Sequence, residues 1–399
     1  MTQSARLPTW FWGLALVVGL GMIGVGLVLL VLPFFFSSTL EVIEIVMAGY
    51  GLLATVLGVG LGIAGLRGRR QLPSERFYPK RGWLSLALAS VGVGVVSLLV
   101  PGGAQSNPLF ALLYVALIVL PSLCLFSLVS LAVGRDLAVT RRRGVLAIAG
   151  GASSILLVLP MELIGMVVSG VLGTSIAFLI PGGPAEIERL ILLLQRWSKR
   201  PPVDETEVLA LLTSPVVMLI LALLLGVITP LIEEFGKTLM IGVMGHWVRP
   251  SVAASFVWGV ACGLGFAWFE GISNGAMGLG GSAVWLGSAG VRFLATAMHG
   301  LTSGLLGLGW GWARRGRWWA LPIAYGAAVI FHGLWNLNVI LALGGIGLSL
   351  SSPEAGGAVA MVAVLVQLVL ILASFAGLFG LPIWLRGRLA AEAVQHDSA

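Results

Sequence analysis

Long apolar runs dominate the chain, and short polar or basic segments separate them. A run of about twenty apolar residues is long enough to cross a hydrocarbon core of roughly 30 Å as a helix. The breaks between runs predict ten spans, at residues 9–36, 43–66, 83–101, 108–134, 145–172, 213–246, 252–275, 291–312, 318–343 and 358–385. The fold class expected from this pattern is all-α: a polytopic transmembrane helical bundle of about ten spans.

Basic residues concentrate in every second loop between these spans. Those that follow the even-numbered spans are Arg67, Arg69, Arg70, Arg76, Lys80, Arg81, Arg135, Arg141, Arg142, Arg143, Arg249, Arg314, Arg315, Arg317, Arg386 and Arg388. Loops rich in lysine and arginine face the cytoplasm in most membrane proteins. The pattern therefore predicts that both termini are cytoplasmic.

One segment between the fifth and sixth spans has a different pattern. Apolar residues recur there at helical spacing among charged ones: Ile187, Leu190, Ile191, Leu194 and Trp197. This spacing predicts an amphipathic helix that lies on the membrane. Pro201, Pro202 and the acidic residues Asp204, Glu205 and Glu207 separate it from span six. Two roles stay open for the helix, a plain connector and a gate or docking surface for a substrate helix.

The same pattern divides the chain into four parts. We predict a five-span membrane scaffold at 1–180, an external amphipathic segment at 181–212, a four-span core at 213–343, and a last span with a cytoplasmic tail at 344–399. The first part holds few intramembrane ionisable residues, chiefly Glu162. The chemistry is therefore expected after residue 213.

Composition agrees with a bilayer environment. The chain has 399 residues, of which 58% are hydrophobic and 10% charged, whereas soluble domains carry roughly a quarter charged residues. The net charge of +7 and the pI near 10.1 come from loop residues, so they indicate topology and exclude nucleic acid as a partner. Arginine far outnumbers lysine, which is typical of a GC-rich bacterial genome. For a bacterial protein, the apolar spans predict a location in the inner or plasma membrane.

The two cysteines and two of the four histidines have simple structural interpretations. Cys124 and Cys262 lie inside predicted spans without the spacing of a redox or zinc site, so we interpret them as small core residues. His246 lies at a span end beside Trp247, which indicates an interfacial residue, and His396 belongs to a polar tail.

Spans six to nine contain six ionisable residues, Glu233, Glu234, Lys237, Glu270, His299 and His332. A charge near the bilayer centre costs at least about 2.5–3.5 kcal/mol on insertion scales, so such a residue indicates function. A single intramembrane histidine is more often a packing residue or part of a proton path. The presence of two histidines near the glutamates favours a shared site.

Spacing suggests how these residues work together. Glu233 lies four residues before Lys237, so the two side chains can pair on one helix face, and Glu234 is turned about 100° away toward another partner. His332 and Asn336 share one face in the same way. Two histidines and carboxylates are the usual donors of a catalytic zinc site. Asn336 or Asn274 would then donate to the developing oxyanion or hold a metal ligand in place.

Small residues at four-residue spacing occur in spans seven and eight. Gly259 and Gly263 form one pair, and Gly300 and Gly304 form the other. Such pairs let helix backbones approach closely. The later spans are therefore expected to form a tight bundle.

Four motifs in this order resemble the PrsW family of bacterial intramembrane proteases. They are Glu-Glu-x-x-Lys at 233–237, Phe-x-x-x-Glu at 266–270, the downstream His299, and His-x-x-x-Asn at 332–336. The resemblance covers roughly residues 213–343 and extends to the wider group of CAAX prenyl proteases and Abi proteins. Lys237 and Glu270 differ from the arginine and histidine of the CAAX pattern, which favours the PrsW branch.

The resemblance implies metal-dependent proteolysis of a membrane-anchored protein, such as the anti-sigma factors that PrsW-like proteins cleave. We expect a divalent metal, in particular zinc, with Glu270, His299 and His332 as candidate ligands. Either Glu233 or Glu234 would be the general base. Lys237 and Asn336 complete the predicted catalytic set.

Two other functions use the same residues. A proton-coupled transporter would relay protons through the intramembrane glutamate, histidine and lysine side chains, and would hold no metal tightly. A non-catalytic member of the fold would bind a partner helix and release no fragment. Metal content and product formation separate these hypotheses.

Overall fold

A computed structural model describes residues 7–33, 42–99, 109–135, 137–200, 205–248, 250–275, 282–349 and 352–397. Arg249, which we assigned to a basic loop, and Pro201, Pro202 and Asp204 of the acidic linker lie outside the described residues. Within these ranges the chain is helical, and the one β-type pairing is an isolated bridge between Arg76 and Thr140.

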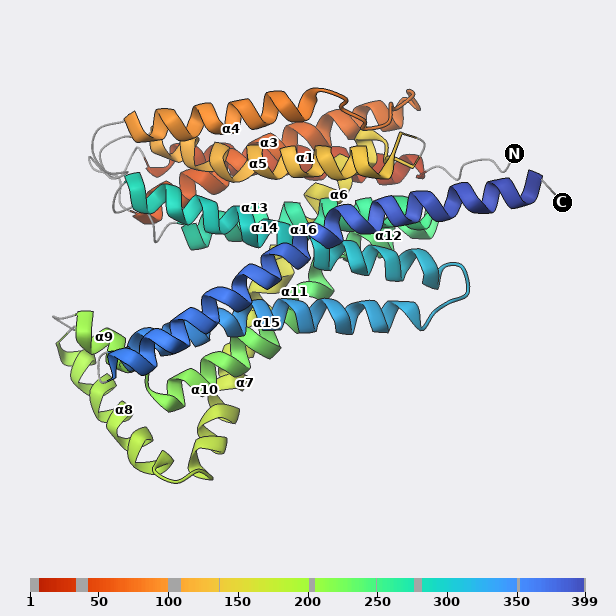
Figure 1. Cartoon of the computed structure of the whole chain (residues 1–399). Coiled ribbons are helices and arrows are strands. Elements are labelled where there is room, and N and C mark those ends of the chain that lie inside the picture. The colour runs from red at the N-terminus through yellow and green to blue at the C-terminus, as the bar shows by residue number, and fades with distance from the viewer. Residues whose placement is uncertain are drawn as a thin grey trace. The chain divides into compact units, whose positions relative to one another are not determined.

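The helices fall into two compact units (Figure 1). The first unit takes Met1–Ile155, Gly236–Tyr325 and Ser374–Ala399, and the second takes Leu156–Phe235 and Gly326–Ala373. Helices of the first unit are α1 (Thr9–Val31), α3 (Val42–Arg69), α4 (Gly82–Leu99), α5 (Leu109–Val133), α6 (Arg141–Ser153), α12 (Leu239–Trp247), α13 (Val252–Gly275) and α14 (Ser282–Ala313).

The second unit contains α7 (Ile155–Phe178), α8 (Gly183–Lys199), α9 (Glu205–Leu212), α10 (Pro215–Leu223) and the π-helix η2 (Leu224–Ile228). The first residue of α7, Ile155, belongs to the first unit, and three further helices contribute residues to both units: α11 (Thr229–Lys237), α15 (Ala320–Ser349) and α16 (Pro353–Asp397). The predicted division into four parts along the sequence stays a prediction.

Nine segments of the described chain are long and apolar enough to cross a membrane. They are Thr9–Val31, Ile43–Arg69, Gly82–Leu99, Leu112–Val133, Arg141–Phe178, Pro215–Trp247, Val252–Asn274, Ala320–Ser349 and Pro353–Gly387. The polytopic helical bundle is therefore confirmed, and the cytoplasmic position of the termini stays a prediction. The eighth predicted span, 291–312, is helical within α14 but is not among the nine, because glycines and polar residues such as His299 interrupt its apolar surface.

Glycines bring α1 and α3 of the first unit into direct backbone contact. A Cβ atom built on Gly19 would lie 2.7 Å from the carbonyl oxygen of Gly58, and one built on Gly26 would lie 2.7 Å from that of Gly51. Figure 1 shows the two helices side by side. A larger side chain at any of these positions would separate the helices.

Three of the four glycines predicted to pack closely in spans seven and eight do so, and Gly300 has only ordinary contacts. Cβ atoms at Gly259 and Gly263 of α13 would overlap the carbonyl oxygens of Ser303 and His299 of α14. Gly304 faces the ring of Phe256. The predicted close approach is confirmed, and it fixes the height and rotation of His299 against α13.

Span six is one predicted run but a series of short helices, because its middle contains a π turn followed by Pro230. Proline has no backbone N–H, so it cannot bond to the carbonyl of Gly226 in the usual helical way. In the second unit Gly333 of α15 packs against that carbonyl, where a Cβ atom would not fit. The π turn therefore determines how closely α15 packs against this part of span six, which leads into Glu233 and Glu234.

The predicted amphipathic helix is confirmed as α8, and its inner face packs within the second unit. Leu190 joins Ala177 and Val216 in a small apolar cluster. At the start of α8, Glu186 accepts hydrogen bonds from Arg189 at 2.6 Å and from the Ser214 hydroxyl at 2.6 Å. These contacts tie α8 to the start of α10.

Candidate metal centre

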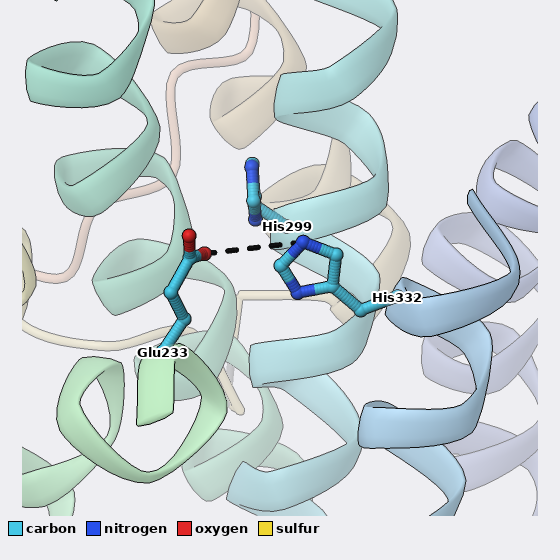
Figure 2. A group of neighbouring side chains, drawn as sticks. All are labelled: Glu233, His299 and His332. Carbon is cyan, nitrogen blue, oxygen red and sulfur yellow. Dashed lines mark ion pairs between the residues drawn. The ribbon is translucent and has the colours of Figure 1, made fainter. Parts of the chain in front are cut away.

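In the second unit, a glutamate pair on α11 faces a histidine on α15. Glu233, Glu234 and His332 are all buried, with exposures of 5%, 0% and 2%. His332 Nδ1 lies 2.8 Å from Glu234 Oε1, and His332 Nε2 lies 3.9 Å from Glu233 Oε2. Figure 2 marks the second of these contacts with a dashed line. Each ring nitrogen of His332 thus faces a different carboxylate.

The two distances indicate different roles for the two glutamates. At 2.8 Å an ionised Glu234 accepts a hydrogen bond from the Nδ1–H of His332, which leaves the Nε2 lone pair toward Glu233. The 3.9 Å separation is too long for a hydrogen bond. Two ligands of one tetrahedral zinc ion, each about 2.1 Å from it, lie about 3.4 Å apart. Nε2 of His332 and Glu233 therefore suit a shared cation.

Asn336, one turn beyond His332 on α15, binds the irregular part of span six. Its side-chain amide donates to the backbone carbonyl of Leu225 in the π turn at 2.8 Å. This bond fixes α15 against the segment that leads into Glu233 and Glu234. The sequence left two roles open for Asn336, donation to the oxyanion and support of a metal ligand. This contact favours the supporting role.

In the first unit, a second group surrounds His299 of α14. His299 is 1% exposed, and its Nε2 lies 2.6 Å from Glu270 Oε2. Its Nδ1 lies 2.7 Å from the Lys237 Nζ atom. Because an ammonium group can only donate, Nδ1 is the acceptor and Nε2 carries the hydrogen that Glu270 accepts. His299 therefore also has one ring nitrogen held by a glutamate.

Lys237 is fully buried, and its charge has two close partners in this group. Besides His299, the Phe266 ring lies 4.4 Å from Nζ, a distance at which a ring face attracts a cation. The sequence pattern predicted a pair between Lys237 and Glu233. That pair stays a prediction, and in the first unit Lys237 places a positive charge at His299 Nδ1.

Two further side chains hold Glu270 in the first unit. Its Oε1 atom accepts hydrogen bonds from Asn274 at 2.9 Å and from Arg292 at 3.0 Å. Asn274 was predicted as a supporting residue, and this bond agrees with that role. Arg292 was not among the residues predicted from the sequence, although a lone arginine in an apolar helix, seven residues before His299, is a signal of function.

A family of known proteins matches the part of the chain that holds both groups. The family described as PrsW family intramembrane metalloprotease matches residues 162–374, which is more than half of the chain. The chain belongs to the PrsW family. The match begins earlier and ends later than the 213–343 region that carries the resemblance.

No curated protein and no solved structure matches the chain. The PrsW match includes every side chain of both groups described above. His246, which we predicted as interfacial, also falls within the match, but it lies edge-on to Trp247 on an exposed part of α12. This PrsW protein is thus a multi-pass membrane protein of an intramembrane metalloprotease family.

Proposed function

We propose that this chain is an intramembrane endopeptidase that uses a divalent metal to cleave a membrane-anchored protein. Family membership supports the class of reaction. The observation that carries the proposal is the pairing of each buried histidine with a glutamate on one ring nitrogen. Carboxylates that hold histidines in this way are typical of metal sites, because they fix the tautomer and raise the basicity of the ligand.

We propose further that both groups of residues belong to one metal centre. The support is the continuity of α11, a helix of nine residues that carries Glu233, Glu234 and Lys237. Residues four apart on a helix share a face, so Glu233 and Lys237 lie on the same side of α11. Within its own unit, each histidine directs its remaining nitrogen at one of these two residues.

The proposed ligands are Glu233, His332 through Nε2 and His299 through Nδ1, whose lone pair would be released by Lys237 when the metal binds. All three are buried and offer donors that zinc prefers. Glu234 and Glu270 hold the histidines, which differs from the sequence-based expectation that Glu270 is itself a ligand. The metal, when bound, would supply an activated water and polarise the scissile carbonyl.

The protein side chains would supply the proton transfers. Glu234 accepts a proton as water adds to the peptide carbonyl and returns it to the leaving nitrogen. Lys237 stabilises the negative charge that develops on the carbonyl oxygen. Asn336 keeps the glutamate pair in register with His332 through its bond to Leu225. Arg292 and Asn274 keep Glu270 aimed at His299.

The substrate class follows from the resemblance and from the membrane location of the site. We propose a membrane-anchored regulatory protein of the anti-sigma-factor kind, cut in the plasma membrane of a bacterial cell. Zinc is the proposed metal, because two histidines and carboxylates are its usual catalytic donors.

Cleavage of a membrane-anchored reporter tests the proposal. We expect Glu234→Gln and His299→Ala each to reduce cleavage by at least about 100-fold, a loss typical of a general base or a metal ligand. The control is His246→Ala, which removes an exposed histidine outside both groups and should cleave normally. Normal cleavage by Glu234→Gln or His299→Ala would refute the assignment.

Metal analysis of the purified protein separates the remaining functions. We expect about one divalent ion per chain in the wild type and in His246→Ala, and a loss of metal in a His299→Ala, His332→Ala double variant. A metal-free wild type that responds to a pH gradient would favour a proton-coupled carrier. Bound metal without any product fragment would favour a non-catalytic helix-binding protein.

A further inference from the structure

The first unit contains two adjoining cavities far along the sequence from the metal residues. Their volumes are about 210 Å³ and 380 Å³, and both are lined by Pro73, Ser74 and Arg142. They lie where α3 ends and α6 begins. The larger one falls within the roughly 300–1,000 Å³ range of small-molecule sites. We refer to the two together as the arginine cavity.

Positive charge dominates the lining of the arginine cavity. Four arginines line it, Arg67, Arg141, Arg142 and Arg143, against one lining carboxylate, Glu75. Glu75 lies 3.3 Å from Arg141, and both side chains are more than two-thirds exposed, at 79% and 67%. Such an exposed ion pair contributes little to stability. Glu75 therefore does not neutralise the positive charge of the four arginines.

The arginines are close enough to repel one another. The charge of Arg67 acts on Arg142, and the charges of Arg142 and Arg76 act on Arg143. Like charges held together in a partly buried place raise the free energy of the folded chain unless an anion joins them. The cluster therefore favours an anionic ligand.

Backbone bonds hold the arginines in place. Phe77 donates to the carbonyl of Val139 at 2.7 Å, and the Arg141 backbone N–H donates to that of Glu75 at 2.9 Å. The Arg142 guanidinium donates to the carbonyl of Leu72 and lies over the Trp12 ring. Because the loop after α3 is fixed to the start of α6, the cluster is built before any ligand arrives.

The apolar surface beside the cavity indicates which anion it takes. Val56, Val59 and Ile63 of α3 are 55%, 44% and 52% exposed, and their spacing places them on one helix face. Ile63 also lines the cavity, and Arg67 follows it by one turn. An apolar strip that leads from the membrane into a basic pocket suits a molecule with a charged head and an acyl chain.

We propose that the arginine cavity binds the phosphate headgroup of an anionic phospholipid, with an acyl chain along Val56, Val59 and Ile63. Guanidinium groups bind phosphate through paired, charge-assisted hydrogen bonds. Basic pockets at the ends of transmembrane helices are known to hold such headgroups. The apolar strip is the reason to choose a lipid over free phosphate.

Native mass spectrometry of the full-length protein in detergent tests this site with phosphatidylglycerol as the probe. The main variant is Arg67→Gln with Arg141→Gln, since both side chains are exposed at the cavity edge. Each arginine near an anionic headgroup contributes roughly a factor of five, so the double variant should bind phosphatidylglycerol about 30-fold more weakly. Phosphatidylcholine should bind both proteins equally weakly.

The matched control is Arg69→Gln with Arg70→Gln, which removes two charges from the same end of α3 without changing the cavity lining. It should change phosphatidylglycerol binding by less than about twofold. An equal loss in both double variants would overturn the proposal in favour of unspecific attraction. Displacement of the lipid by millimolar inorganic phosphate would overturn it in favour of a free-phosphate site.

A second variant keeps the test decisive if the first double variant does not fold. Val59→Asp with Ile63→Asp puts charges on the apolar strip and leaves every arginine unchanged. We expect it to weaken phosphatidylglycerol binding at least about tenfold, because the acyl chain loses its apolar surface. Unchanged binding in this variant would overturn the lipid assignment.

Discussion

Each buried histidine has a glutamate on one ring nitrogen and a residue of α11 on the other. His332 lies between Glu234 and Glu233, and His299 lies between Glu270 and Lys237. Spacing in the sequence identified these residues as a set. It did not assign the ring nitrogens, because this depends on which atoms of distant helices meet.

Arg292 provides a test at the scale of single residues. We expect Arg292→Gln to lower metal affinity and reporter cleavage by about 10- to 100-fold, the usual effect of losing a partner of a metal-site residue. Arg292→Lys keeps the positive charge near Glu270, so it should recover part of the metal affinity and part of the reporter cleavage. The measurement is metal affinity by competition with a chelating dye, together with cleavage rate. Wild-type affinity in Arg292→Gln would show that Glu270 needs no such support.

At the scale of elements, the contact between α13 and α14 places His299. A Cβ atom at Gly263 would overlap the carbonyl of His299 itself. The glycine spacing predicted this close approach, but it does not indicate which carbonyl each glycine meets. That detail depends on the relative height of the two helices, which the whole packed interface sets.

A larger side chain at Gly263 should therefore disturb both stability and catalysis. We expect Gly263→Val to cost about 1–3 kcal/mol, as over-packing does in well-packed interiors, and to reduce cleavage because His299 shifts with its backbone. Thermal unfolding in detergent and the reporter assay measure the two effects. Gly290→Ala on α14 is the control, since a Cβ atom there meets nothing within 4 Å, and it should behave as the wild type.

The stability of the junction between α8 and α10 is expected to depend on pH because of Glu186. The Arg189 guanidinium holds the pKa of the Glu186 carboxyl below its usual value, and the Ser214 hydroxyl adds a second hydrogen bond. A pKa that is lower in the folded than in the unfolded chain stabilises the fold above the unfolded value. That stability is lost as the pH falls through the lowered folded value.

We therefore expect the amides at the start of α8 to lose protection in acid. The measurement is hydrogen exchange, corrected for the intrinsic rate at each pH. Glu186→Gln should show weaker protection at neutral pH and little further loss in acid. Glu188→Gln, on the same helix, leaves the bonds to Arg189 and Ser214 intact and should follow the wild type. A wild-type profile in Glu186→Gln would contradict this prediction.

At the scale of the whole molecule, the proposed metal should contribute to stability. A ligand at 100 times its dissociation constant stabilises the folded state by about 2.7 kcal/mol. Chelation should therefore lower the Tm of the full-length protein by several degrees and abolish cleavage, and added zinc should restore both. The His299→Ala, His332→Ala double variant is the control. An equal Tm shift on chelation in that variant would show that the chelator acts elsewhere.

The sequence by itself determined the membrane class, most of the spans, the amphipathic helix and the set of polar residues that carry the chemistry. Hydrophobic length and helical spacing are local properties, so they are visible in the chain. Only the tertiary structure decided that Glu234 and Glu270 hold histidines, that Arg292 supports Glu270, and that Asn336 binds the π turn. These contacts join residues on different helices, and their geometry depends on side-chain packing that no local pattern encodes.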